Sequence, residues 1–275
     1  MTSVRLISIL LLVFSVSLVS NGQEYLDFNN QYNRQKRVLV VPFDERIYFN
    51  DATAEIARRD GLTHDEIMEY FRYQLNLHLV NSLADSCEIV DLMQDNTREA
   101  EADITGLYTT MSYELRLAEF ELDTENMSNL ARKRAEKIEE ARRKQREEEM
   151  KNARPGMQNG ELIGRKQNTD DMYLHIIIGQ PEVLKEIASR RNVDYYLFIN
   201  QFDIKTDYRD PYLSGQRNVY RIMRVHFSIY NTNGEFVSGN YASTKVPLYE
   251  DDKERIVNQY FPDIMRQIVK KIKFH

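Results

Sequence analysis

Three runs within Val193–Pro247 decide the fold: Tyr195–Ile204 (YYLFINQFDI), Val219–Asn231 (VYRIMRVHFSIYN) and Glu235–Val246 (EFVSGNYASTKV). The first is rich in apolar and aromatic residues and predicts a strand. The second and third alternate apolar with polar residues and meet at Asn233-Gly234. This dipeptide favours a type I′ turn, in which both central residues have positive φ, so the two runs predict a long β-hairpin.

The hairpin is expected to have one buried and one solvated face, because strand residues alternate between the two sides of a sheet. The apolar side carries Val225, Phe227 and Ile229, and the side expected to face water carries Arg224, His226, Ser228 and Tyr230. Glycine inside a strand often marks a bulge, so Gly239 predicts one in the second arm.

The segment Asp252–Ile272 predicts a closing helix. Its apolar residues recur at helical spacing and are Ile256, Val257, Tyr260, Phe261, Ile264, Met265, Ile268, Val269 and Ile272. Such a stripe needs an apolar surface to cover, so we expect the helix to pack on the sheet. Pro262 should kink the helix or start its second half. Lys270, Lys271 and Lys273 stand at the negative end of the helix dipole, with Lys271 on the solvated side.

Towards the N-terminus, Arg37–Phe43 reads RVLVVPF, with four consecutive apolar residues before a proline. This predicts a strand buried on both faces that ends at Pro42, since proline cannot donate to a strand ladder. Thr63 and Glu66 form a capping box for a helix, whose apolar stripe is Ile67, Phe71, Leu75, Leu79 and Leu83. The remaining predicted elements are strands at Cys87–Leu92 and Met172–Ile178 and a helix at Pro181–Asn192.

The segment Thr97–Ala118 fits two patterns. Leu107, Met111 and Leu115 have helical spacing, while alternation from Leu107 to Leu117 fits a strand. Its length and its acidic start favour a helix, because negative side chains stabilise a helix N-terminus. We therefore predict a helix over this segment.

The segment Glu125–Asp171 is predicted to be an insertion in the α/β domain. Glu125–Arg154 consists largely of Glu, Lys and Arg, and pairs such as Glu139–Arg143 at i,i+4 support a solvated helix. Apolar residues almost cease after Ile138, which argues against a coiled coil. Arg154–Asp171 is punctuated by glycines and a proline and predicts a mobile loop.

The N-terminus has the features of a secretory signal. Arg5 precedes the charge-free, largely apolar run Leu6–Val19, and a small-residue exit allows cleavage before Gln23. The run is shorter than the roughly 20 residues of a membrane-spanning helix, and no later segment reaches that length. We expect residues 1–22 to be removed, leaving a flexible leader at 23–36 and one α/β domain at 37–275.

Composition argues against several classes of function. The formal net charge of −6 is the opposite of the basic character that nucleic-acid-binding domains show. The five histidines show no metal-binding spacing, and the single cysteine, Cys87, can form no internal disulfide. Gly160–Lys166 does not match a phosphate-binding loop, because its spacing differs and no strand precedes it. We predict no metal, no cofactor and no nucleic-acid partner. Export without disulfides fits a bacterial periplasm.

The strand at Val38–Phe43, the strand at Val193–Ile199 and the hairpin at Val225–Ser238 resemble the amino-terminal domain of TolB and the related periplasmic domain of CsgG-like envelope proteins. The resemblance implies an α/β fold, a mixed sheet of about five strands with packed helices. It also implies a binding or assembly role in the envelope rather than catalysis. No propeller follows, which departs from TolB. No lipidation cysteine or pore hairpin is present, which departs from CsgG-like secretion channels.

Two groups of residues could form a functional site. Asp44 and Glu45 follow the first buried strand, where α/β sheets often bind ligands, and would serve an envelope hydrolase. Aromatic residues on loops can anchor protein partners, and the candidates for such a contact surface are Tyr48, Phe49, Tyr208, Tyr212 and Tyr220. The leading hypothesis is an exported, non-catalytic binding or assembly module of the bacterial cell envelope, in the periplasm or at the outer membrane. The alternatives are the hydrolase and a structural adaptor that acts through the charged insertion.

Overall fold

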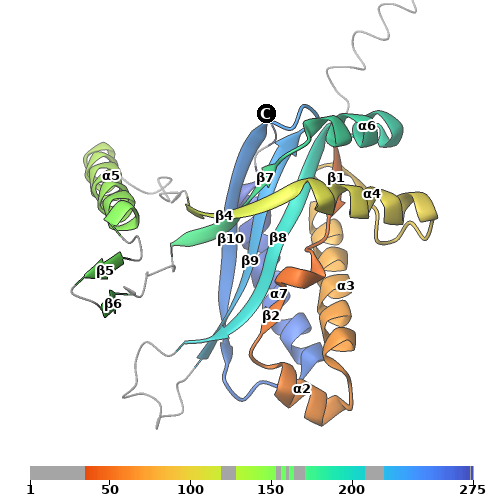
Figure 1. The fold of residues 1–275 in the computed structure, drawn as a ribbon, viewed down its shortest axis with the longest axis horizontal. Helices are drawn as coiled ribbons and strands as arrows, with labels where there is room; N and C mark the ends of the chain where they lie inside the picture. The colour runs from red at the N-terminus through yellow and green to blue at the C-terminus, as the bar shows by residue number, and fades with distance from the viewer. Residues whose placement is uncertain are drawn as a thin grey trace, which may run out of the picture. The chain divides into compact units, whose positions relative to one another are not determined.

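The structure is a computed structural model that describes residues 35–118, 128–152, 156–158, 161–163, 171–207, 220–272 and 274 (Figure 1). The predicted signal and nearly all of the predicted leader fall in residues 1–34 and lie outside this part of the chain. Residues Arg37–His275 form one compact unit. Among the described residues, no helix is both long enough and apolar enough to cross a membrane.

The central feature is a mixed sheet with the strand order β10-β9-β8-β1-β3. Its strands are β1 (Arg37–Val41), β3 (Glu88–Asp91), β8 (Tyr195–Thr206), β9 (Tyr220–Asn231) and β10 (Phe236–Pro247). β1 runs parallel to both of its neighbours, whereas β9 runs antiparallel to both β8 and β10. A two-residue strand, β2 (Phe49–Asn50), also pairs with β8. The predicted α/β fold, a mixed sheet with packed helices, is confirmed.

β1 lies in the middle of the parallel part of the sheet and is buried on both faces. Its four apolar residues, Val38 to Val41, have no exposed surface. Val38 and Val40 belong to the apolar cluster on one side of the sheet, and Leu39 and Val41 belong to the cluster on the other side. The strand ends directly before Pro42, as the sequence predicts.

Three helices pack on the first face of the sheet: α2 (Thr53–Asp60), α3 (His64–Leu83) and α7 (Lys253–Lys271). α3 begins with the predicted capping box, in which the hydroxyl of Thr63 accepts from the amide of Glu66 and the Glu66 carboxylate accepts from the amide of Thr63. These two bonds satisfy amides that the first helical turn cannot satisfy itself.

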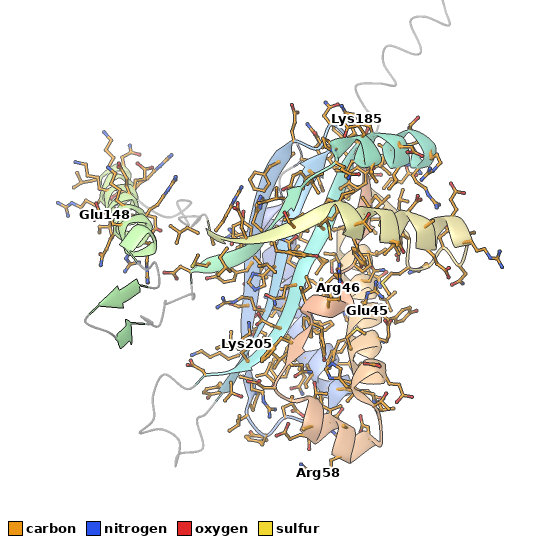
Figure 2. All side chains as sticks on the ribbon, viewed as in Figure 1. Glu45, Arg46, Arg58, Glu148, Lys185 and Lys205 are labelled. Carbon is orange, nitrogen blue, oxygen red and sulfur yellow. The ribbon has the colours of Figure 1, made fainter. Side chains whose placement is uncertain are left out.

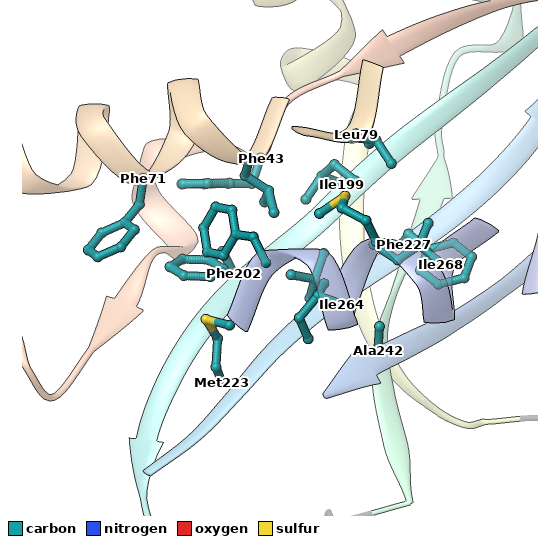
Figure 3. Close-up of a cluster of buried hydrophobic side chains, with 14 of the residues drawn as sticks. Phe43, Phe71, Leu79, Ile199, Phe202, Met223, Phe227, Ala242, Ile264 and Ile268 are labelled. Carbon is teal, nitrogen blue, oxygen red and sulfur yellow. The ribbon is translucent and has the colours of Figure 1, made fainter. Parts of the chain in front are cut away.

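The apolar stripes of α3 and α7 meet over the sheet (Figure 3). Phe71 of α3 lies next to Phe202 of β8 and Phe261 of α7, with ring centroids 5.5 Å and 6.3 Å away. Ile264 and Ile268 of α7 have no exposed surface. Full burial of each large apolar side chain stabilises the fold by about 1.5 to 3 kcal/mol, so this layer is a main source of stability. The predicted helix stripes are confirmed.

The second face carries α4 (Arg98–Thr110), α6 (Pro181–Arg191) and a two-stranded sheet of β4 (Met111–Leu117) and β7 (Met172–Ile178). The apolar cluster on this side includes Leu107 of α4, Leu184 of α6 and Ile176 of β7. Pro181 lies in the first turn of α6, where its missing amide hydrogen is no loss.

The prediction of one helix over Thr97–Ala118 is wrong in its second half. α4 ends at Thr110, and the chain continues directly as β4. Each of the two periodicities in the sequence therefore applies to one half of the segment. β4 is a strand because β7 pairs with it, and β7 lies beyond the insertion, where a local pattern cannot show it.

The β9–β10 hairpin is confirmed, but its turn is not type I′. The amide of Gly234 donates to Asn231 O at 3.0 Å, and the amide of Asn231 donates to Glu235 O at 3.0 Å. Gly234 has a φ of +78°, whereas Asn233 does not have positive φ. The connection is therefore a three-residue loop in which a type I turn precedes a left-handed glycine. The side-chain oxygen of Asn231 stabilises this loop by accepting from the amides of Asn233 and Glu235.

Gly239 is required by packing between the two sheets. The predicted bulge in β10 is present, but it lies between Phe236 and Ser238, where the register shifts, and not at Gly239. A Cβ atom at position 239 would lie 2.9 Å from the side chain of Tyr173 on β7. The glycine leaves the space that lets β7 approach the main sheet.

The side of β9 that was expected to face water is largely buried. His226, Ser228 and Tyr230 are at most 4% exposed, and each contacts β7 or a neighbouring strand. The alternation in the sequence correctly separates the two sides of the strand. The prediction of a solvated face is wrong because a second sheet, formed by distant residues, covers it.

The insertion connects the paired strands β4 and β7. Leu117 pairs with Met172, and the amide of Ala118 donates to Asp171 O at 2.9 Å. The two ends of the insertion are therefore hydrogen-bonded to each other.

The described part of the insertion contains one helix and one small hairpin. Most described side chains of α5 (Asn129–Asn152) are exposed, as predicted for a solvated helix. The predicted loop at Arg154–Asp171 is corrected: it contains two paired strands, β5 (Gly156–Gln158) and β6 (Glu161–Ile163).

Replacing residues 119–170 with a four-residue Gly/Ser turn should change the free energy of unfolding by no more than about 1 kcal/mol, because loop length affects stability only slowly. The hydrogen-bonded pair of Ala118 and Asp171 allows a short turn to close the hairpin. Urea denaturation of both proteins measures the difference. A loss of several kcal/mol would show that the insertion packs on the domain.

Candidate functional site

The loops after β1 and β3 lie where α/β sheets most often bind ligands. The chain passes from β1 to α3 on the first face of the sheet, and from β3 to α4 on the second face. The crevice between two such loops, at the carboxyl ends of parallel strands, is the usual ligand position in open α/β sheets. The carboxylates predicted for a hydrolase, Asp44 and Glu45, follow β1 at this place. Figure 2 shows Glu45 beside Arg46.

Asp44 is buried and paired with Arg46. Its carboxylate accepts from the backbone amide of Arg46 at 3.0 Å and from the Arg46 Nε at 2.9 Å and 3.0 Å. Burial alone would raise the pKa of Asp44, but the hydrogen bonds and charge of Arg46 outweigh this effect and hold the pKa below its ordinary value. Asp44 is therefore an ion-paired carboxylate, which is unsuited to act as a general acid.

Arg72 of α3 lies against the loop after β1. Its Nε donates to Phe43 O at 3.1 Å, and its Nη2 donates to the Tyr108 hydroxyl at 2.9 Å. Its Nη1 lies 3.1 Å from a carboxylate oxygen of Glu45 and 3.2 Å from one of Glu69. A buried guanidinium thus lies beside the carboxyl end of β1, the end of the strand at which α/β sheets often bind ligands.

Tyr108, which bonds to Arg72, belongs to α4 on the second face of the sheet. Its hydroxyl donates to Pro42 O at 2.8 Å, and burial raises its pKa to about 12. Asp44 and Glu45 therefore contact different arginines and share no proton. The sequence could not identify Arg72 and Tyr108, because neither belongs to a local motif.

A second polar cluster is buried between β7 and the main sheet. The amide of Leu174 on β7 donates to His226 Nδ1 at 2.9 Å, and His226 Nε2 lies 3.4 Å from a carboxylate oxygen of Asp203. The side-chain amide of Asn200 donates to Leu174 O at 2.6 Å. The Tyr230 hydroxyl donates to Ile176 O. The edge of β7 that does not pair with β4 is therefore held by side chains of the main sheet.

His175 of β7 lies within this cluster and is 1% exposed. Its Nδ1 lies 3.3 Å from the Tyr173 hydroxyl and 3.4 Å from the Ser228 hydroxyl, and its Nε2 lies 3.3 Å from the Tyr230 hydroxyl. Burial, with a contribution from the charge of Arg116, lowers its pKa to about 4. The imidazole is therefore neutral at neutral pH.

These histidines, Ser228 and Asp203 do not form a nucleophilic relay. His226 contacts Asp203 and a backbone amide, so neither ring nitrogen is directed at a serine. Ser228 faces the other histidine, His175, and is fully buried. A serine nucleophile needs one histidine that contacts both the hydroxyl and the carboxylate. The cluster instead joins the two sheets.

The predicted contact residue Tyr48 is buried and does not belong to an exposed surface. It is 9% exposed, and its ring stacks on Phe43 and Phe202 at centroid distances of 5.9 Å and 6.0 Å. Its hydroxyl accepts from the side-chain amide of Asn50 at 2.8 Å. Tyr48 was mistaken for a surface residue because it follows a charged turn, although its ring folds back into the core.

The other described candidates, Phe49 and Tyr220, are 48% and 37% exposed. Lys205 Nζ lies 5.3 Å from the centroid of the Phe49 ring, and Lys245 Nζ lies 5.7 Å from that of Tyr220. Ile222 of β9 pairs with Lys205 on one side and with Lys245 on the other. We call these five residues the lysine–aromatic surface. Figure 2 shows Lys205 near the end of β8, away from Glu45 and Arg46.

The sequence identified part of this surface. Tyr208 and Tyr212 fall in residues 208–219, which lie outside the described part of the chain. Lys205, Ile222 and Lys245 were missed, although all three follow from the strand alternation once the register of the sheet is known.

The search for metal sites in the described residues and the comparisons with known proteins gave no further candidate for a functional site. Within the described ranges, no three His, Cys, Asp or Glu side chains come together in a way that could hold a metal ion. No family model, curated protein or solved structure matches the chain. The resemblance to the TolB and CsgG-like domains therefore remains an expectation from the sequence.

Proposed function

We propose that this protein is an exported, non-catalytic module of the bacterial cell envelope that binds another envelope protein. The observation that carries the proposal is the lysine–aromatic surface. Exposed aromatic rings with apolar and cationic neighbours are typical of protein interfaces. Phe49, Tyr220 and Ile222 would supply the apolar contact, and the two lysines would orient the partner.

The partner is expected to carry acidic side chains opposite Lys205 and Lys245. Both lysines are exposed and lie on one face of the sheet, on the two strands that flank β9, although the whole chain has a formal net charge of −6. Opposite charges at an interface accelerate association and select the partner.

The geometry at the sheet end supports binding rather than hydrolysis. Asp44 is paired with Arg46, and Arg72 is bonded to Phe43 O just after the carboxyl end of β1. Export is supported by the apolar run Leu6–Val19 and the small residues that follow it.

Photocrosslinking in living cells tests the proposal. A photoreactive phenylalanine at position 49 or 220 should crosslink to the same envelope protein, whereas the same group at Tyr73, which is 47% exposed on α3, should not. Combining Lys205→Gln with Lys245→Glu should lower the crosslinked yield by about tenfold, because it removes one cation and reverses the other. Glutamine is used at position 205 because Lys205 also pairs with the buried Asp203 at 2.8 Å, where a second carboxylate would disturb the fold.

The matched control combines Arg58→Gln with Lys185→Glu, two exposed cations on α2 and α6, and should leave the yield unchanged. Equal crosslinking from positions 49, 220 and 73 would contradict a specific surface. Recovery of the protein in the cytoplasm would contradict the envelope assignment.

A further inference from the structure

β4 presents an unpaired edge in the part of the chain that the structure describes. It pairs with β7 alone, and the backbone contacts that frame this pairing are Ala118 N–H to Asp171 O and Gly179 N–H to Thr110 O. Along a strand in an antiparallel ladder, every second residue directs both its amide and its carbonyl to the strand on one side. The residues between them direct these groups to the other side. The even-numbered residues of β4 therefore bond to β7. The odd-numbered residues point their backbone groups away from it, and these are Met111, Tyr113, Leu115 and Leu117.

The edge of β10 differs, because side chains of α7 cover it. Gln267 accepts from the amide of Ser243 at 3.2 Å and donates to its carbonyl at 2.9 Å, as a neighbouring strand would. Lys271 donates to Tyr241 O at 2.5 Å. Such caps prevent an edge strand from pairing with another chain. No comparable side-chain bond caps the outer edge of β4 among the described residues.

The sequence of β4 is complementary to itself. In an antiparallel pair centred on Leu115, Glu114 of one copy lies opposite Arg116 of the other, and Arg116 lies opposite Glu114. Tyr113 lies opposite Leu117, and the two Leu115 residues lie opposite each other. Leu115 is 43% exposed in the single chain, so this pairing would remove apolar surface from water.

Other registers lack this match. Centring the pair on Glu114 places two Glu114 carboxylates opposite each other, and centring it on Tyr113 places Glu114 opposite Ser112. Only the register centred on Leu115 combines opposite charges with outward-facing backbone groups. Its three pairs of odd-numbered residues would form about six backbone hydrogen bonds.

We propose that two copies of this protein associate through β4 and form a continuous four-stranded sheet in the order β7-β4-β4-β7. The charge pattern of Glu114 and Arg116 selects a second copy of the same chain as the occupant of the edge. In the single chain these two side chains already form an ion pair on one face of the strand. In the dimer each would also face the opposite charge of the second copy. The surface is separate from the lysine–aromatic surface, so the proposal does not rest on the proposed function.

Sedimentation equilibrium of the purified protein tests the dimer. The wild-type protein should sediment at twice the monomer mass. Glu114→Arg would place a second guanidinium opposite Arg116 at two points in each dimer and should raise the dissociation constant about tenfold or more. Arg116→Glu should do the same through paired glutamates. The double variant restores opposite charges in reversed order and should restore the dimer.

Two further variants test the edge itself. Leu115→Pro removes an outward-facing amide, which an edge strand tolerates, and should give a folded monomer by circular dichroism. Leu115→Cys should form a disulfide-linked dimer on mild oxidation, because directly opposite residues lie within disulfide reach. Cys87 is buried and should not compete.

The control is Glu186→Arg, which makes the same charge change in an exposed ion pair with Arg190 on α6 and should leave the dimer intact. A wild-type monomer at all concentrations would overturn the proposal. So would a dimer that persists with Leu115→Pro, or a double charge variant that stays as weak as the single variants.

Discussion

Replacing Ile264 with aspartate should lower the free energy of unfolding by about 4 kcal/mol, because it places an unpaired charge in the apolar layer between α7 and the sheet. Ile264 has no exposed surface, and its neighbours in this layer are apolar (Figure 3). The whole stability of a domain is about 5 to 15 kcal/mol, so the variant should be partly or fully unfolded at 37 °C. Ile268→Asp should behave in the same way. Thermal and urea denaturation measure both variants.

The matched control is Lys270→Asp, because Lys270 is exposed in the last turn of the same helix. It should cost about 0.3 to 1 kcal/mol through a poorer match to the helix dipole. The neighbouring Lys271 is unsuitable as a control, and the expectation that it faces water is wrong: its ammonium donates to Tyr241 O. Similar small losses from Ile264→Asp and Lys270→Asp would show that α7 does not cover the sheet.

Acid should destabilise the protein between about pH 6.5 and pH 4, through the two buried histidines. Burial lowers the pKa of His175 to about 4, and burial also lowers the pKa of His226 despite the neighbouring Asp203. A histidine with a lowered folded pKa binds its proton more readily in the unfolded chain. Stability is therefore full above the unfolded pKa, about 6.5, and decreases as the pH falls towards the folded pKa.

From these pKa values, His175 alone should reduce the free energy of unfolding by about 2 kcal/mol between pH 7 and pH 5. His226 should add to the loss, because a proton on Nδ1 would oppose the Leu174 amide that now donates to it. Urea denaturation at the two pH values gives the difference. Combining His175→Gln with His226→Gln should reduce this difference, whatever the variants do to stability at pH 7.

The control for this experiment is Leu130→Gln, which changes an exposed side chain of α5 without adding or removing a titratable group and should leave the difference between the two pH values unchanged. A wild-type protein with equal stability at pH 7 and pH 5 would contradict the assignment of the buried neutral imidazoles.

Elements with strong local patterns were predictable from the sequence. β1 followed from four apolar residues before Pro42, α3 from its capping box, and α7 from its stripe. In these cases one short segment contains both the pattern and the reason for it. The alternation in Val225–Tyr230 likewise assigned residues to the two sides of β9 correctly.

What the sequence could not show was which distant segments cover which surfaces. The polar side of β9 looks like a solvated face until β7 is placed over it. Arg72 of α3 bonds to Tyr108 of α4 after β1, and no sequence motif joins these two residues. Tyr48 shows the same limit, since its position after a charged turn says nothing of the direction of its ring.

The way in which the main sheet holds β7 has a consequence for the accuracy of folding. A backbone ladder repeats every two residues, so a strand in a ladder can shift by two positions and form an equivalent set of bonds. The outer edge of β7 meets the side chains of Asn200, His226 and Tyr230, which bond to its backbone and would find equivalent groups after such a shift. The side chain of His175 distinguishes the alignments, because its ring nitrogens lie 3.4 Å from the Ser228 hydroxyl and 3.3 Å from the Tyr230 hydroxyl. A shift of two residues would put Tyr173 or Ile177 at this place, and an isoleucine would leave both buried hydroxyls without this contact. His175 therefore favours one alignment of the second sheet on the first.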